Sequence, residues 1–355
     1  SIIDRLIEQA ELLDIKLIKP KKILENINER NTIKISEPTL IIEELLKLNK
    51  LKKEYKLLKD INSHYEEEIT ERKIITEENE LIDSKYEKYL FFEVVVTENG
   101  KNSTSTKIKI KVDNSNFELE TLAREAIQNA IDKLHYQEIE ANNYKAIITG
   151  EVMGELLNCF IPMFSAENIQ KDISLLTNKI NKKVFSEKIT IIEDPNNTKL
   201  LGKRLFDDTG TKTEYKEIVK NGVFNQILYD EKTAIKDNTK PTGNDYGQIS
   251  VRNLYIEPGK KSLEELIKEQ DKAILIDSMV GMHSGVNSVT GEISLQSEGY
   301  YIENGKLKYA SKMFVVSTNI MELLNNVIEI SNNLEFYIPT TASPDILVDN
   351  IKFVK

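Results

Sequence analysis

The sequence predicts an α+β protein with two domains, and three observations carry this prediction. Apolar residues first recur at helical spacing, then alternate every second residue, and then return to helical spacing. A short polar stretch, Glu138 to Asn143, follows, and the chain beyond it is rich in strand patterns and hairpin signals. We therefore expect a domain of helices and antiparallel sheet over residues 1–141 and a β-rich domain over residues 142–355.

The predicted N-terminal domain begins with helices. Between Ile2 and Leu13, apolar residues recur at intervals of three and four and form one stripe. Pro38 suits the first turn of a second helix, whose apolar cluster runs to Leu48. We interpret this second helix as packing on the sheet of its own domain, with a role in binding a partner as the alternative.

The predicted sheet of this domain is a pair of strands joined by a tight turn. Tyr86 to Thr97 has the pattern of a long strand, and Asn99-Gly100 is typical of a hairpin because both central residues need positive φ. From Lys107 to Val112 apolar residues alternate with lysines, which predicts a return strand with one buried face. Leu119 to Leu134 carries a continuous apolar stripe, which predicts a helix.

The predicted C-terminal domain combines strands with short helices. Tyr144 to Thr149 is expected to be a strand that leads into a helix at about Val152 to Phe160, and Ile346 to Val354 a final strand. Further hairpins and helices are predicted between them, the hairpins at Asn221-Gly222, Thr290-Gly291 and Asn304-Gly305, and the helices at Leu263–Asp271 and Asn319–Ile330.

Composition excludes several classes of protein. The chain has 355 residues, 40% of them apolar, and a formal net charge of -10, which argues against a general nucleic-acid binder. Cys159 is the only cysteine, so no intramolecular disulfide can form. We see neither a signal-peptide pattern nor an apolar run that approaches the ~20 residues of a membrane span. We therefore expect a soluble, cytoplasmic protein without membrane or nucleic-acid partners.

Histidine chemistry finds little support. The three histidines are His64, His135 and His283, and none has a second histidine three to five residues away. The chain therefore contains neither an HExxH nor an HExxxH zinc element. His283 is the most suggestive, because it lies in a glycine-flanked loop, but no partner for it is evident in the sequence.

Other candidate residues also have ordinary structural explanations. Glu151 and Glu155 stand four residues apart and share one helix face, which suits an acid/base or metal pair but also the first turns of a helix. Cys159 lies in an apolar stretch, where a cysteine behaves as a small hydrophobic residue. From these residues alone, we predict no catalytic residue and no cofactor-binding residue.

A series of strings in the C-terminal half goes further than these single residues. The strings are IEDP at 192–195, RLFDDTG at 204–210, VKNGV at 219–223, KPTGN at 240–244, NLYIEPG at 253–259, SLEEL at 262–266, GVNSVTGEIS at 285–294 and SEGYYIENGK at 297–306. In their residues and their order, these strings resemble the TldD/PmbA family of peptidases, and its PmbA (TldE) branch in particular. A weaker resemblance extends back to about residue 1.

The resemblance implies an α/β N-terminal domain and a β-rich, barrel-like C-terminal domain. It also implies where a zinc site would lie, because TldD members hold zinc with an HExxxH helix and a later cysteine. The positions matching that motif here are Leu157, Asn158 and Pro162; shifted by one residue, they become Asn158, Cys159 and Met163. Neither set can rebuild a water-activating zinc centre, so we expect no metal in this chain.

The PmbA branch also lacks the zinc ligands, and its members resemble non-catalytic subunits that pair with a TldD-like subunit. The resemblance thus implies a heterodimer that degrades unfolded peptides or trims leader peptides, with zinc only in the partner. Extended peptides commonly add a strand to a sheet edge, which makes the strands near residues 86–112 the candidates here. Part of the family's N-terminal domain, a strand-rich segment, is expected to be missing from this chain.

Two alternatives stay open. The chain could be a metal-free, self-associating peptide-binding or scaffold protein without a catalytic partner. It could also be an autonomous hydrolase that uses residues such as Glu151, Glu155, His283 or Cys159.

Overall fold

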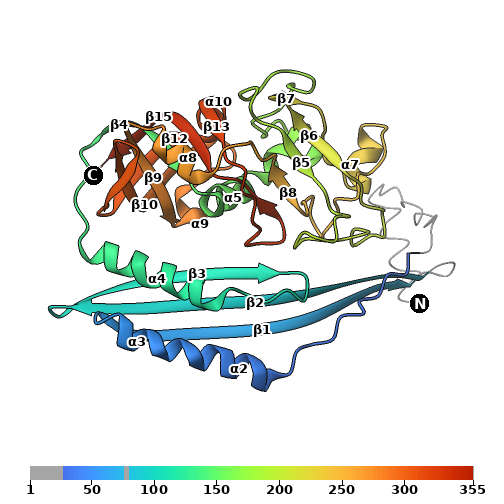
Figure 1. The fold of residues 1–355 in the computed structure, drawn as a ribbon. Coiled ribbons are helices and arrows are strands. Elements are labelled where there is room, and N and C mark those ends of the chain that lie inside the picture. Colours follow the sequence, from blue (N-terminus) through green and yellow to red (C-terminus); the bar gives the residue numbers. More distant parts are fainter. Residues whose placement is uncertain (1–26, 76–79, 355) are drawn as a thin grey trace.

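The structure is a computed structural model that describes residues 27–75 and 80–354. Figure 1 shows a long sheet along one side of the molecule and the C-terminal region lying along its length. The helices are α2 (Pro38–Lys47), η1 (Leu48–Lys50), α3 (Leu51–Glu54), α4 (Leu119–Leu134), α5 (Gly150–Cys159), η2 (Ile161–Phe164), α6 (Ala166–Gln170), α7 (Glu231–Lys236), α8 (Leu263–Lys268), α9 (Met282–Gly285) and α10 (Ile320–Asn325).

The long sheet is antiparallel, with strand order β1-β2-β3: β1 (Leu58–Ile75), β2 (Glu80–Glu98) and β3 (Lys101–Lys111). Asn99 and Gly100 have φ of 50° and 79° and join β2 to β3, as the sequence predicts. Alternate residues of β2, among them Phe92 and Val94, are fully buried, and they form one core with α4 and the residues around η1. This confirms the helix predicted at 119–134, and the structure shows that it packs on the sheet.

The C-terminal region contains a closed barrel. Hydrogen-bonded pairs link β10 (Glu292–Glu303) to β12 (Phe314–Asn319), β12 to β15 (Ile346–Val354), β15 to β4 (Asn142–Ile148), β4 to β9 (Lys272–Val280) and β9 back to β10. Two further strands extend it, β11 (Lys306–Ala310) on β10 and β13 (Val327–Ile330) on β15. The ring removes free sheet edges and encloses apolar side chains. The predicted α+β class with a β-rich, barrel-like C-terminal part is confirmed.

A second sheet lies beside the barrel, and three of the strings quoted above, IEDP, VKNGV and NLYIEPG, contribute to its strands. Its order is β14-β8-β5-β6-β7, with β5 (Ile191–Glu193), β6 (Lys216–Lys220), β7 (Val223–Phe224), β8 (Leu254–Ile256) and β14 (Thr341–Ala342). Asn221 and Gly222 form the predicted tight turn between β6 and β7, with φ of 48° and 78°. Asn304 and Gly305 likewise join β10 to β11.

Three predictions need correction. β1 was not predicted as a strand, because charged residues lie on both of its faces and its burial is slight. The helix predicted over 319–330 ends at Asn325, and Val327–Ile330 is instead strand β13, held by pairing with β15. Thr290-Gly291 lies in a wider loop closed by a bridge between Val286 and Ile293. The helix predicted between Ile2 and Leu13 lies outside the described residues.

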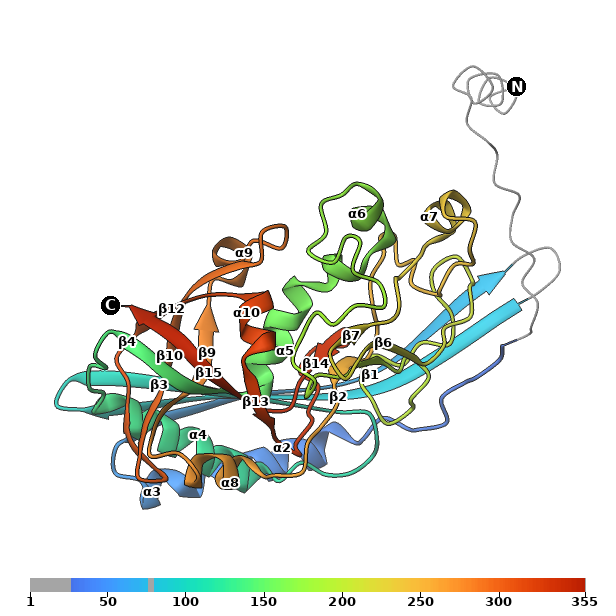
Figure 2. The same cartoon turned by 90° about the horizontal axis from the view of Figure 1, so that it is seen from above.

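The two parts of the chain meet along the long sheet. Arg72 of β1 donates to the carbonyl oxygens of Phe206 and Asp207, each at 3.3 Å, and to an Asp208 carboxylate oxygen at 3.0 Å. Figure 2 shows this end of β1 and β2 reaching beyond the barrel, past the second sheet. Among the described helices, none is long and apolar enough to cross a membrane.

Candidate functional site

A cleft lies where the long sheet faces the barrel. It has a cavity volume of about 360 Å³ and is lined by residues 104–107 of β3, by α4, by the start of α5, by the end of β9 and by parts of the segment 333–345. Leu157 and Asn158, two of the positions expected to match the HExxxH motif, lie on α5, the helix whose first residues line the cleft. We therefore take this cleft as the candidate functional site.

The start of α5 is fixed against segment 343–345. The Gly150 N–H donates to Asp345 Oδ1 at 2.8 Å, and Asp345 is 3% exposed. A Cβ on Gly150 would lie 2.2 Å from the Ser343 carbonyl oxygen, so only glycine allows this approach. The carboxylate also satisfies one of the N–H groups that a helix N-terminus leaves unpaired. Burial raises the pKa of Asp345, and the hydrogen bond from Gly150 opposes that rise.

Two acids in the cleft have no direct partner among the described side chains. Asp277, at the end of β9, has a buried Oδ1 that receives no hydrogen bond. Burial raises its pKa, although the charge of Lys133 pulls it back. Glu151 keeps contact with solvent in the cleft, yet the surrounding walls desolvate its carboxylate and raise its pKa, which the charge of Lys107 opposes. Of these residues, Glu151 was a predicted candidate from the sequence, whereas Asp277 and Lys107 were not.

The positions matching the lost zinc motif provide no zinc site. Leu157 is fully buried in the C-terminal core, Asn158 accepts a hydrogen bond from Thr340 Oγ1 at 2.7 Å, and Pro162 lies in the 3-10 turn η2. In the shifted alignment, burial raises the pKa of the Cys159 thiol, and Met163 is buried in the same core. An amide, a buried thioether and a protonated thiol do not fit Zn²⁺. No three His, Cys, Asp or Glu side chains within residues 27–75 and 80–354 are grouped to hold a metal ion.

The three histidines and Glu155 do not line the cleft. His283 lies exposed in α9 on the barrel, whereas His64 and His135 lie beside Glu66 and Glu98 at 3.5 and 3.1 Å. Glu155, one turn beyond Glu151, does not line the cavity, although burial raises its pKa as well. Of the residues named for an autonomous hydrolase, only Glu151 lines the cleft.

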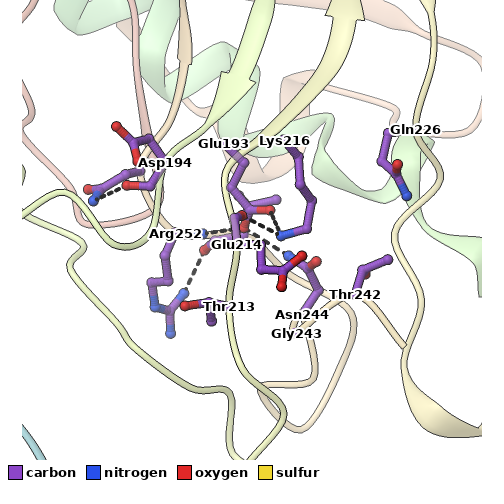
Figure 3. Close-up of polar contacts among 12 residues, drawn as sticks. Glu193, Asp194, Thr213, Glu214, Lys216, Gln226, Thr242, Gly243, Asn244 and Arg252 are labelled. Atoms are coloured by element: carbon purple, nitrogen blue, oxygen red, sulfur yellow. Dashed lines mark hydrogen bonds and ion pairs between the residues drawn. The ribbon is translucent and has the colours of Figure 1, made fainter. Parts of the chain in front are cut away.

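Two of the strings that carry the resemblance, IEDP and KPTGN, meet in a buried polar network (Figure 3). Glu193 is fully buried and accepts from Lys216 Nζ at 2.8 Å, Asn244 Nδ2 at 2.8 Å and the Arg252 backbone N–H at 3.0 Å. The Arg252 guanidinium stacks on the Tyr246 ring, 4.2 Å from its centre. Every oxygen of Glu193 is engaged, so this network ties β5, β6 and the loop 244–252 together and serves the fold.

Comparisons with known proteins agree with this architecture. Residues 141–355 match the family model described as the PmbA/TldA metallopeptidase C-terminal domain. The chain is 28% identical over 216 residues to a Metalloprotease PmbA homolog of Buchnera aphidicola, covering 61% of this chain and 47% of that protein. It is 24% identical to Metalloprotease PmbA of Escherichia coli O157:H7, with the same coverage of 61% and 47%. The chain thus spans about half the length of the curated relatives it matches.

Solved structures extend the likeness to nearly the whole chain. A proposed modulator of DNA gyrase from Thermotoga maritima is 26% identical with a TM-score of 0.84, covering 97% of this chain and 82% of that one. TldE from Thermococcus kodakarensis shares the fold, with a TM-score of 0.77 at 23% identity, over 98% of this chain and 84% of that one. The chain belongs to the PmbA/TldD metallopeptidase family and is a PmbA/TldE-type member of it.

Proposed function

We propose that this chain is a non-catalytic, PmbA/TldE-type subunit of a metallopeptidase complex, and that it helps to hold an unfolded peptide for a TldD-type partner. The observation that carries the proposal is that the positions expected to match the zinc motif, Leu157, Asn158 and Pro162, carry no zinc-binding side chain. Leu157 has become part of the core, and Asn158 is bonded to Thr340. Zinc and the water-activating glutamate are then supplied by the partner.

The free edge of β3 supports the peptide-binding part of this proposal. In the order β1-β2-β3, one edge of β3 has no strand partner among the described residues. Residues 104–107 of β3 line the cleft. An extended peptide could therefore add a strand to β3 through main-chain hydrogen bonds, which is how many proteins bind peptides with little regard to sequence.

Reconstitution tests the proposal. The chain and a TldD-type subunit from the same organism are purified separately, and cleavage of an unfolded peptide is followed for each alone and for the mixture. We expect chelator-sensitive cleavage by the mixture, a stable complex of the two chains on gel filtration, and zinc that stays with the partner. The matched control is a partner whose HExxxH glutamate is replaced by glutamine, which should bind this chain but leave the mixture inactive. A mixture no more active than the partner alone, together with self-association of this chain, favours the scaffold alternative.

A further inference from the structure

The cleft between β3 and α5 contains more unpaired negative than positive charge. Four acids line it, and two of them have partners: Glu335 is paired with Lys109 and Tyr337, and Asp345 accepts from Gly150. The two without partners among the described side chains are Glu151 and Asp277.

The basic side chains of the cleft do not compensate for both acids. Lys133 donates to Glu298 at 3.1 Å and is used there. Lys107 lies close enough to Glu151 to attract it, but it forms no ion pair with it. Among the described residues that line the cleft, one lysine without an ion-pair partner thus faces two carboxylates without one. Because Asp277 has a buried oxygen without a partner among the described residues, and such a carboxylate is costly, this arrangement favours a cation supplied from outside the chain.

Two buried polar atoms also support a ligand in this cleft. Asp277 Oδ1 and Thr149 Oγ1 are both buried and have no hydrogen-bond partner among the described residues, and both residues line the cavity. Thr149 is the N-cap residue of α5, yet its side chain does not cap the helix, so its hydroxyl remains available as an acceptor. Native proteins rarely leave such atoms unsatisfied without a functional reason.

We propose that Asp277, Glu151 and Thr149 form a binding site for a primary ammonium group of the peptide, either its N-terminal amine or a lysine side chain. The inference rests on the proposed function. A primary ammonium has three N–H donors and no acceptor, which matches three oxygen-bearing side chains from β9 and from the start of α5. The same three residues suit a divalent cation poorly, since they include only two carboxylates and no third grouped ligand lies among the described residues.

Calorimetric titration of the purified full-length chain tests this site. Three unstructured peptides of one alanine- and serine-based sequence are compared, all with amidated C-termini. The first has a free N-terminus, the second is N-acetylated, and the third is N-acetylated and carries one lysine. We expect the acetylated peptide without lysine to bind at least about tenfold more weakly than the best amine-bearing peptide, a difference of about 1.4 kcal/mol. Tight binding of the first or the third peptide tells which amine is recognised.

Variants locate the effect. Asp277→Asn should reduce binding of the amine-bearing peptide to the level of the acetylated one, and Glu151→Gln should weaken it in the same direction. Glu155→Gln is the matched control, because Glu155 lies on the same helix with no direct partner but outside the cavity. If wild-type protein binds all three peptides equally, the ammonium site is refuted while peptide binding stands. If none of the peptides binds, the ammonium site and peptide binding by this chain alone are both refuted, and the complex with a TldD-type subunit remains to be judged by reconstitution.

Discussion

Single residues of this protein fall into two kinds: buried charges that are fully paired and serve the fold, and charges in the cleft that are not. Glu193 accepts three hydrogen bonds and is fully buried, whereas Asp277 has an oxygen with no partner among the described residues. Unpaired buried charge lowers stability, so its presence marks a site kept for another purpose. Two residue-scale predictions follow from this contrast.

Asp277 should make stability depend on pH. Burial raises its pKa above the unfolded value, about 3.9, so the folded chain holds this proton more readily. Its contribution is therefore most favourable below pH 3.9 or so and is lost as pH rises toward the folded pKa. Relative to wild type, Asp277→Asn should gain free energy of unfolding as the pH rises above the unfolded pKa, because the variant has no buried carboxyl to deprotonate.

Urea unfolding at a series of pH values measures this gain. Asp349→Asn is the control, because Asp349 is exposed on β15, and it should run parallel to wild type throughout. A wild-type advantage over Asp277→Asn at neutral pH would contradict the description of Asp277 as an uncompensated charge.

Lys216 should be essential to the buried network. Its Nζ is the cation nearest to Glu193, and Lys216→Met would leave that carboxylate fully buried without a counterion. We expect a loss of about 3–5 kcal/mol in the free energy of unfolding. Lys220→Met, on the same strand, removes only an exposed pair with Glu217 and should cost less than about 1 kcal/mol. If the two variants lose the same free energy of unfolding in thermal or urea unfolding, the buried network does not stabilise the fold.

At the scale of elements, α5 is the part whose position decides the shape of the cleft. Its first turn approaches the backbone of residues 342–345 at Gly150 and Gly154, and the buried Asp345 accepts its first N–H. Gly150→Ala should push the helix from this contact and destabilise the protein by roughly 1–3 kcal/mol. Glu155→Ala, an exposed change on the same helix, is the control. An unfolding midpoint for Gly150→Ala that equals the control's would contradict the close approach.

Elements were predictable from the sequence where the local pattern was strong. The helix at 119–134 and the Asn-Gly turns could be predicted because apolar spacing and positive φ are local properties. Strand β1 could not be predicted, because charged residues on both of its faces hide the alternation of apolar and polar residues. It is held as a strand by its pairing with β2. β13 was predicted as helix because its four residues, Val327–Ile330, are too few to show the two-residue period of a strand. Its strand conformation depends on pairing with β15, which is distant in the sequence.

The site was less predictable than the fold. The sequence identified the helix that should carry zinc and found Glu151 on it, because motif positions are local. Asp277, Lys107 and Asp345 come together only through the barrel and the long sheet, so no spacing in the sequence relates them. The only local feature that could have indicated a role for Asp277 is its position as a polar residue directly after the buried run Ala273–Ile276.

At the scale of the whole molecule, the end of the long hairpin is anchored on the second sheet. Lys203 is 7% exposed and lies 3.1 Å from an oxygen of Asp83, which is itself buried on β2. Lys203→Met should leave Asp83 without this cation and loosen the attachment by about 3–5 kcal/mol. Hydrogen exchange of amides near 81–86 should then accelerate, whereas Lys199→Met, an exposed neighbour, should leave it unchanged. Unchanged exchange in Lys203→Met would mean that other contacts hold the hairpin.

The central proposal is that this member of the PmbA/TldD family does not cleave peptides by itself. The most direct measurement is cleavage of an unfolded peptide by the purified chain alone, supplied with Zn²⁺, with and without a chelator. A TldD-type subunit assayed in parallel confirms that the substrate is competent. The account predicts no chelator-sensitive cleavage by this chain, since Leu157, Asn158 and Pro162 cannot serve as zinc ligands. Cleavage by the chain alone that the chelator abolishes would contradict it.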